Sequence, residues 1–419
     1  MLILYNLLLT LALILGFPLW ILIIFKKKYR FGIPRKLCLY SKPLTSKKAI
    51  LIHTVSVGEV NAALPFIETY RKEKPEATLL ITCSTLTGYN NARSKCPHCL
   101  VEYLPLDFFW TVKRFFSLYS VERIFILETE LWPNFIHRAA SLNIPVYLIN
   151  GRLSDHSFPR YKYLKTLLKH SFNQITLFFC QAPLDAERFK ALGVPPSKII
   201  VTGNIKFDSA LQAWHKAIGR TSTHYYKPYA EARPMIWLAG STQEEENIPC
   251  LKTYLELKKE LPSLHFILVP RKPESLSACL LFLKENSIPF TLRSSFKTGD
   301  KIEDIFIIDT IGELFDLYQF ASVVFIGKTL TENGGGQNPL EPAVWGKAIL
   351  MGKAYQNFRT IADEMDKNKA LEIVPDWETL ENRIYTLLTH QEIQKKMGEN
   401  ARLYVEKNAK ASEIIMEKI

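Results

Sequence analysis

The sequence lacks the common signatures of nucleic-acid recognition. Its 419 residues contain no zinc finger, RNP motif or helix-turn-helix pattern. This absence matters because 53 Lys and Arg outnumber 41 Asp and Glu, giving a net charge of +12. A basic chain can bind nucleic acid, an anionic membrane surface or a phosphorylated substrate. We therefore expect no nucleic-acid partner and retain the other two classes.

The cysteines form no recognisable framework. Seven are scattered along the chain, and the only close pair is Cys96 and Cys99 in a CxxC motif. A structural zinc site needs a second CxxC or a histidine pair at matching spacing, and neither follows. The pattern favours reduced thiols without disulfides, and we expect no bound metal or other cofactor.

Charge is absent from the first 25 residues. That length spans a bilayer core of ~30 Å. Because Lys26, Lys27, Lys28 and Arg30 follow at once, the positive-inside rule places the rest of the chain in the cytoplasm. A cleaved signal peptide would carry its charge before the apolar run. The sequence predicts a single-pass membrane-anchor helix over 1–25, with a helix lying in the membrane interface or a buried core helix as alternatives.

Beyond the anchor, short apolar runs alternate with helix-length amphipathic segments. Seven runs precede a mixed polar stretch, and six follow it. Their length and their β-branched and aromatic residues predict two α/β domains, each with a parallel, doubly wound sheet, and a ligand cleft at the carboxyl ends of the strands. The predicted parts are a basic linker at 26–48, a first domain at 49–210, a linker at 211–233, a second domain at 234–395 and a C-terminal helix at 396–419.

No Walker A motif or Rossmann GxGxxG is present, and the most glycine-rich stretch is GGGQNPLEPA at 334–343. Glycine weakens helices and strands, so three in a row suit a loop that approaches a ligand closely. The stretch follows a strand-like run and precedes a helix expected from Leu340 to Gly346. We expect bare N–H groups there to bind a phosphate.

Asn338 and Glu341 in this stretch have the spacing of a capping box, with Pro339 at the first helical position. Pro342 argues against that arrangement, since its missing N–H falls where the first intrahelical bond forms. We expect the helix to begin later, which frees Glu341 to accept hydrogen bonds from a ligand such as a ribose diol.

Carboxylates follow two strands of the first domain. Gly58 permits a turn that projects Glu59 at the mouth of the sheet, as a candidate general base. A first-turn glutamate that balances the helix dipole is the equal alternative. Glu128 and Glu130 share one side of an extended strand. Such a pair suits acceptor binding or proton handling, with a solvated strand exit as the alternative.

Basic and hydroxyl side chains follow other strands. Arg152 comes just after a strand of the first domain. In the second domain, Arg271 can clamp a phosphate with two hydrogen bonds, although a surface Arg-Lys pair is an equal interpretation. Ser241 and Thr242 end a strand and begin a helix, where they suit a helix cap or a phosphate contact.

These motifs, in this order, resemble the 3-deoxy-D-manno-octulosonic acid (Kdo) transferases of lipopolysaccharide assembly. The resemblance covers nearly the whole chain. It implies a GT-B fold, in which two Rossmann-like domains face a cleft. It rests on the anchor and on SVGE at 56–59, ETELWPN at 128–134, NGRLS at 150–154, VTGNIKFD at 201–208, PRKPE at 270–274 and GGQNPLEPA at 335–343.

The resemblance implies inverting, metal-independent transfer of Kdo from CMP-Kdo to a lipid A precursor, at the cytoplasmic face of the inner membrane and in contact with membrane lipids. Glu59 matches the catalytic base of the family. The implied acceptor-binding residues are Ser56, Gly58, Glu128, Glu130 and Arg152. The implied CMP-Kdo-binding residues are Ser241, Thr242, Pro270, Arg271, Gly334, Gly335, Gly336, Gln337, Asn338 and Glu341.

The chain departs from the family pattern at four positions. Gln337, Lys272 and Gln243 stand where histidine is usual, and Glu245 replaces a glycine. Gln337 cannot carry a proton at neutral pH. Two other functions stay open. One is another GT-B enzyme, such as a UDP-sugar lipid transferase or a nucleotide-sugar epimerase. The other is a degenerate homologue that binds nucleotides or lipids without turnover.

Overall fold

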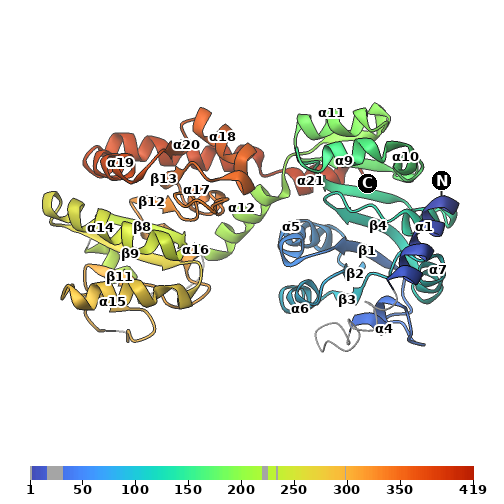
Figure 1. The fold of residues 1–419 in the computed structure, drawn as a ribbon, viewed down its shortest axis with the longest axis horizontal. Helices are drawn as coiled ribbons and strands as arrows, with labels where there is room; N and C mark the ends of the chain where they lie inside the picture. Colours follow the sequence, from blue (N-terminus) through green and yellow to red (C-terminus); the bar gives the residue numbers. More distant parts are fainter. Residues whose placement is uncertain (1, 17–31, 219–224, 233–234, 298) are drawn as a thin grey trace. The chain divides into compact units, whose positions relative to one another are not determined.

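Figure 1 shows the fold of the chain in a computed structural model. The structure describes residues 2–16, 32–218, 225–232, 235–297 and 299–419. The chain divides into two compact units, and each unit is built on its own sheet. The N-terminal unit comprises Met1–Ser209 and Ala409–Ile419, and the C-terminal unit comprises Ala210–Asn408.

The N-terminal unit contains a seven-stranded sheet in the order β3-β2-β1-β4-β5-β6-β7. All of its neighbouring strands are parallel. The strands are β1 (Ala49–Thr54), β2 (Thr78–Cys83), β3 (Leu100–Tyr103), β4 (Val121–Leu127), β5 (Val146–Gly151), β6 (Leu177–Cys180) and β7 (Ile199–Val201).

Helices cover both faces of this sheet. Successive residues of β1 alternate between two apolar clusters: Leu51 packs in one, and Ile50 and Ile52 pack in the other with Phe66. This two-sided burial is typical of a parallel sheet. The helices are α1 (Leu2–Leu15), α4 (Gly32–Lys36), α5 (Val57–Glu73), α6 (Leu86–Lys95), α7 (Phe109–Leu118), α8 (Pro133–Ser141), α9 (Phe158–Tyr163), α10 (Lys165–Gln174), α11 (Pro183–Ala191), a 3-10 turn at Pro196–Lys198 and α21 (Ala411–Glu417).

The C-terminal unit has a second parallel sheet in the order β10-β11-β9-β8-β12-β13-β14. Its strands are β8 (Met235–Thr242), β9 (Leu264–Pro270), β10 (Thr291–Leu292), β11 (Ile305–Ile307), β12 (Val323–Ile326), β13 (Ala348–Gly352) and β14 (Glu372–Val374). Its helices are α13 (Lys227–Glu231), α14 (Glu244–Glu260), α15 (Ser277–Glu285), α16 (Leu314–Leu317), α17 (Leu340–Val344), α18 (Arg359–Lys367), α19 (Trp377–Thr389) and α20 (Gln391–Asn408), with 3-10 turns at Pro273–Leu276, Tyr318–Phe320 and Gln356–Phe358. Helix α12 (Ile205–Ala217) begins in the N-terminal unit and ends in this one.

The α/β class and the two parallel sheets confirm the sequence prediction. All thirteen predicted apolar runs contain a strand. Strand β14 was missed because it has only three residues and begins with Glu372. At the C-terminus, α20 belongs to the C-terminal unit, whereas Ala411 and Ile415 of α21 pack into a core cluster of the N-terminal unit.

The strand order determines where a ligand can bind. In each sheet, the first strands of the unit lie on one side of its first strand and the later strands lie on the other side. The connections therefore diverge between β1 and β4 in the N-terminal unit, and between β8 and β12 in the C-terminal unit. Ligands of open α/β sheets bind at the carboxyl ends of the strands beside such switch points. We therefore expect a ligand site in the loops that follow these four strands.

The predicted membrane-anchor helix has a shorter counterpart in the structure. Helix α1 covers Leu2–Leu15. Over the part of the chain that the structure describes, no helix combines the length and the apolarity that crossing a membrane requires. The later part of the predicted anchor, from residue 17, lies outside the described residues.

Candidate functional site

Glu59 lies in the first turn of α5, directly after β1 at the switch point of the N-terminal unit. Its Oε2 accepts a hydrogen bond from the Val55 N–H at 2.7 Å, and its Oε1 accepts one from the Ser56 hydroxyl at 3.3 Å. The side chain therefore lies in the first turn, as the alternative interpretation predicted, and it bonds back to the two residues that precede its helix. It is half-buried, and that burial changes its acidity.

The Glu59 carboxyl is a much weaker acid than an exposed glutamate. Burial raises its pKa to about 7, the negative charges of Glu128 and Glu130 add to that increase, and the bonds from Val55 and Ser56 oppose it. A carboxylate with this pKa is poised to take up and release protons near neutral pH. Since two other carboxylates perturb it, the three form one acidic cluster at the switch point.

Gly58 does not have the role predicted for it. It lies inside α5 rather than in a turn before the helix. Its φ is not positive, and an added Cβ would approach only the Ser56 Oγ, at 3.7 Å. The corner that presents Glu59 is formed by the extended backbone of Ser56, with φ −127° and ψ 171°.

The prediction that Glu128 and Glu130 lie on one extended strand is also wrong. Strand β4 ends at Leu127, and Glu128 adopts a left-handed conformation with φ 57°. The turn still keeps the two carboxylates close, since burial and the Glu128 charge both raise the pKa of Glu130. Thr129 between them is anchored at both ends: its hydroxyl donates to the Arg152 carbonyl, and its own carbonyl accepts from the Tyr161 hydroxyl.

The sequence reasoning missed a basic residue at this edge. Burial lowers the pKa of Lys206, while the Glu128 charge raises it and the Arg152 charge lowers it. Lys206 therefore lies near both predicted acceptor residues. Its helix is positioned by Asn150, which accepts a hydrogen bond from the Ile205 N–H at 3.1 Å. The signal was present, because Lys206 belongs to the VTGNIKFD run that carried the resemblance.

In the C-terminal unit, the glycine loop differs from its prediction. Gly335 (φ 124°) and Gly336 (φ 77°) adopt backbone conformations that favour glycine. Their N–H groups are not bare, however, since they donate to the carbonyls of Ala354 and Lys328 at 2.8 and 2.9 Å. These bonds fix the loop to its neighbours, and they leave the N–H groups that follow the triplet as the better candidates for a phosphate contact.

The helix after this loop begins at Leu340, earlier than expected. Pro342 falls in its first turn, where a missing N–H costs nothing. The Asn338 side chain caps the turn by accepting from the Leu340 N–H at 3.1 Å, and it donates to Glu341 at 3.2 Å. Burial raises the pKa of Glu341, whereas Asn338 and the Arg271 charge lower it. Arg271 and Glu341 therefore lie within electrostatic range of one another.

Arg271 is held at this edge by its backbone. Its N–H donates to the Thr242 carbonyl at 2.8 Å, and Thr242 pairs with Pro270 across β8 and β9. The Arg271 side chain is exposed. Thr242 is fully buried, and its hydroxyl donates to Asn247 at 2.7 Å, so it supports the site rather than capping α14. The residue at the N-cap of α14 is Gln243.

Glu246 holds this edge of the sheet together, a role that was not predicted from the sequence. Its buried carboxylate accepts four backbone N–H groups: Gln243 at 2.9 Å, Lys328 at 2.6 Å, Thr329 at 2.9 Å and Leu330 at 3.0 Å. The last three begin the loop that leads to the glycine triplet. One side chain therefore ties the loop after β12 to the helix after β8.

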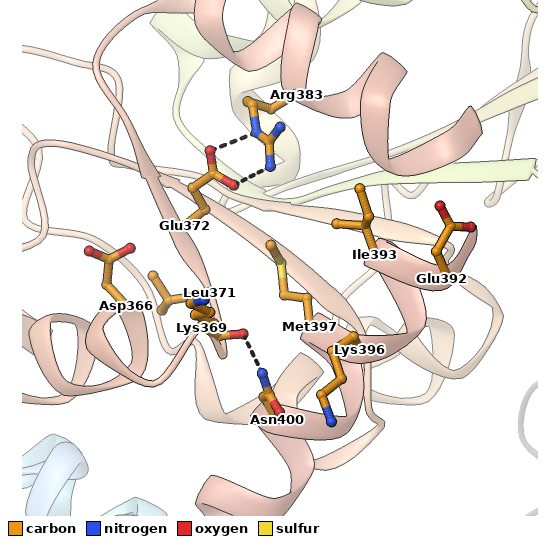
Figure 2. Close-up of a pocket in the computed structure, with 10 residues that line it drawn as sticks. All are labelled: Asp366, Lys369, Leu371, Glu372, Arg383, Glu392, Ile393, Lys396, Met397 and Asn400. Atoms are coloured by element: carbon orange, nitrogen blue, oxygen red, sulfur yellow. Dashed lines mark hydrogen bonds and ion pairs between the residues drawn. The ribbon is translucent and has the colours of Figure 1, made fainter. Parts of the chain in front are cut away.

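The C-terminal unit also contains a cavity of about 490 Å³ (Figure 2). It is formed by α18, β14, α19 and the start of α20. Arg383 pairs with Glu372 across it at 2.6 Å, and Asn400 donates to the Lys369 carbonyl at 3.2 Å. No predicted site residue lines it. Across the described ranges, no group of three or more His, Cys, Asp and Glu side chains has the arrangement of a metal site.

Comparisons with known proteins identify the family of the chain. Residues 28–209 match a family model described as 3-deoxy-D-manno-octulosonic-acid transferase. A Haemophilus influenzae protein named 3-deoxy-D-manno-octulosonic acid transferase is 32% identical over 84% of this chain and 82% of its own length. A Rickettsia felis protein of the same name is 28% identical over 87% of this chain and 77% of its own.

The fold also resembles a solved enzyme structure. UDP-GlcNAc 2-epimerase from Neisseria meningitidis aligns with 88% of this chain and 99% of its own, with a TM-score of 0.63 at 15% identity. At that identity the likeness shows the GT-B-like fold alone. The sequence relatives identify the family: this chain is a member of the 3-deoxy-D-manno-octulosonic acid (Kdo) transferases.

Proposed function

We propose that this enzyme transfers Kdo from CMP-Kdo to a sugar hydroxyl of a lipid A precursor, with Glu59 as the general base. The observation that carries the proposal is the Glu59 carboxyl at the switch point, with its pKa raised to about 7 beside Glu128 and Glu130. A base with this pKa is ionised in part at neutral pH and is strong enough to accept a hydroxyl proton.

The reaction is an inverting displacement. Glu59 takes the proton of the acceptor hydroxyl, the oxygen attacks the anomeric carbon of Kdo, and CMP leaves with the electrons of the broken bond. Ser56, Gly58, Glu128, Glu130 and Arg152 line the acceptor side.

The donor side is formed by the C-terminal unit. Arg271 offsets the charge on the phosphate of departing CMP, and Glu341 accepts hydrogen bonds from the ribose. In this proposal, Arg271 and the backbone N–H groups after the glycine triplet stabilise the leaving group in place of a metal ion. The remaining donor contacts come from Ser241, Pro270, Gly334, Gln337 and Asn338. Thr242, Gly335 and Gly336 are buried and hold these loops in place.

We place the enzyme at the cytoplasmic face of the inner membrane, attached through residues 1–25. The net charge of +12 favours this location, since a basic protein is attracted to anionic lipid. CMP-Kdo carries a phosphate and a carboxylate, and the lipid acceptor is phosphorylated, so the same excess charge attracts both substrates.

The direct test is mass spectrometry of the lipid after incubation with CMP-Kdo. A mass increase of one or more Kdo residues supports the proposal. Calorimetry with CMP and UDP tests the alternative of a UDP-sugar enzyme, because tighter binding of UDP would contradict a CMP-Kdo site. Donor binding with no product on any lipid acceptor would indicate a non-catalytic homologue.

The pH dependence tests Glu59 more closely. A general base works only when ionised, so we expect kcat/KM to rise with pH through an apparent pKa of about 7. Ser56→Ala removes a hydrogen bond that lowers the pKa of Glu59. In this variant the rise of kcat/KM with pH should therefore shift to higher pH. Initial rates measured from pH 5 to 9 would show both effects. A flat profile down to pH 5 would rule Glu59 out as the base.

Gly334→Ala tests the donor loop. An added Cβ would stand 2.2 Å from the Ala354 Cβ and 2.9 Å from the Lys328 carbonyl oxygen. Overpacking of this kind costs about 1–3 kcal/mol, so we expect affinity for CMP-Kdo to fall about tenfold or more. The double variant Gly334→Ala with Ala354→Gly removes the shortest contact and should recover part of the loss in calorimetry. Unchanged affinity in the single variant would show that the loop does not bind the donor.

A further inference from the structure

Helix α1 has the opposite arrangement of polar and apolar side chains from an ordinary surface helix. Two of its three polar side chains, Tyr5 and Asn6, contact the rest of the N-terminal unit, and the exposed Thr10 hydroxyl donates to the Asn6 carbonyl. Most of its large apolar side chains face outward. None of its described residues is buried, and seven large apolar side chains are between 48% and 85% exposed. These are Ile3, Leu4, Leu7, Leu8, Leu11, Ile14 and Leu15.

Tyr5 and Asn6 form hydrogen bonds with two buried polar side chains, Asp107 and Asn134. The Tyr5 hydroxyl donates to the Asp107 carboxylate at 2.9 Å, and the amides of Asn6 and Asn134 exchange hydrogen bonds of 2.9 Å. Asp107 is 6% exposed and Asn134 is 3% exposed. The Asp107 carboxylate also accepts the N–H groups of Asn134 and Phe135. The four side chains of Tyr5, Asn6, Asp107 and Asn134 form what we call the polar latch.

The latch is incompatible with a helix that crosses the bilayer. A helix rises 1.5 Å per residue, and a hydrocarbon core is ~30 Å thick. If residues 1–25 spanned the membrane with Lys26 at the cytoplasmic face, Tyr5 and Asn6 would lie near the opposite face. They could then not reach Asp107 and Asn134, which belong to the same unit as Glu59.

We propose that α1 is an interfacial helix, locked to the N-terminal unit by the polar latch, and that its apolar face lies in the surface of an anionic lipid bilayer. Seven outward-facing Leu and Ile side chains on a helix without charge need a nonpolar environment. Two large aromatic residues at the start of α7, close in sequence to Asp107, extend this surface: Phe109 is 62% exposed and Trp110 is 52% exposed.

Charge complementarity identifies the partner as an anionic surface. Residues 156–184 contain four lysines and arginines and no acidic residue. All four basic residues lie in α9 and α10, and α10 packs against α8, which carries Asn134. Tyr163 at the end of α9 is 90% exposed. Basic and aromatic side chains in the same unit as an exposed apolar helix suit a protein that lies on an anionic membrane.

The latch also lies at the edge of the sheet that carries the site. Asp107 follows β3, and Asn134 lies in the first turn of the helix that follows β4, so both are at the carboxyl ends of parallel strands, as Glu59 and Glu130 are. A bilayer in contact with α1 would therefore lie beside the acceptor residues. This inference rests on the proposed function only in taking the acceptor to be a membrane lipid.

Cross-linking in membranes tests the position of α1. In the full-length enzyme, Asn6→Cys is combined with Asn134→Cys, and a short bis-maleimide is added to membrane vesicles; the Tyr5 bond to Asp107 remains to hold the helix. The matched control pairs Ile14→Cys with Asn134→Cys, since Ile14 lies two helical turns further along α1. The wild-type chain controls for its seven cysteines, of which six are buried.

We expect the Asn6 pair to cross-link and the Ile14 pair not to. A spanning helix predicts the opposite order, because Ile14 would then be closer to the cytoplasmic units than Asn6. Loss of the Asn6 cross-link in membranes would overturn the proposal.

Protease protection of an N-terminal tag gives an independent measurement. We expect the tag to be digested in inverted vesicles and protected in spheroplasts. Digestion in spheroplasts would place the N-terminus across the membrane and would also overturn the proposal. Neither readout depends on Kdo transfer, so failure of this inference is distinguishable from failure of the proposed function.

Discussion

Glu59→Gln is expected to lower kcat for transfer to the lipid acceptor by about 10²–10⁴, the usual contribution of a general base. The amide has the shape of the carboxyl and can still accept from the Val55 N–H, but it cannot take up the hydroxyl proton. Affinity for CMP-Kdo should be unchanged, since the proposed donor contacts lie in the C-terminal unit. Initial rates and calorimetry measure the two quantities separately.

The fold should tolerate this change. Burial raises the pKa of Glu59 to about 7, so above that pH the folded protein carries a half-buried negative charge that costs stability relative to the unfolded chain, where the carboxyl ionises freely. A neutral glutamine removes that cost, so we expect an unfolding temperature at pH 8 that is unchanged or higher. Glu73→Gln, at the exposed end of the same helix, is the matched control and should retain full activity. Full activity in Glu59→Gln would exclude it as the base.

Glu246→Gln is expected to destabilise the C-terminal unit and to abolish tight binding of CMP-Kdo. Each carboxylate oxygen accepts two N–H groups, and the amide nitrogen of glutamine cannot accept any. Two N–H groups that are at least partly buried would lose their partner, at about 1–3 kcal/mol each. For a unit of this size we expect the unfolding temperature to fall by at least about 5 °C.

The chain supplies a close control for this variant. Glu245 precedes Glu246 in α14 and is exposed, so Glu245→Gln should change the unfolding temperature and the donor affinity little. Thermal unfolding and calorimetry with CMP-Kdo measure both effects. If Glu246→Gln bound CMP-Kdo as tightly as the wild type, the loop that begins at Lys328 would not contribute to the donor site.

The sheets and their edges were predictable because parallel strands have a strong local signature. Runs such as Leu264–Pro270 are short, apolar and fully buried, and the spacing between runs leaves room for one helix. The carboxyl edge then follows from the parallel arrangement. This is why residues as far apart as Glu59 and Glu128, or Arg271 and Glu341, were correctly expected at the same edges.

Local backbone geometry was predicted less well. Gly58 was expected in a turn and lies in a helix, whereas Glu128 was expected in a strand and has φ 57°. The N–H groups of Gly335 and Gly336 were expected to be free and are bonded to Ala354 and Lys328. The partners of these two N–H groups lie in other segments of the chain, so spacing along the sequence carried no information about them.

The sequence by itself determined the fold class, the strand exits and the family, because each of these depends on residue type and spacing. It could not distinguish Glu246 from Glu244 and Glu245, three identical residues in a row. It also could not show that Tyr5 and Asn6 contact buried polar groups more than 100 residues away. Only the tertiary structure decides these roles, because a buried hydrogen bond depends on which segments meet in space, and that follows from packing of the whole unit rather than from any local pattern.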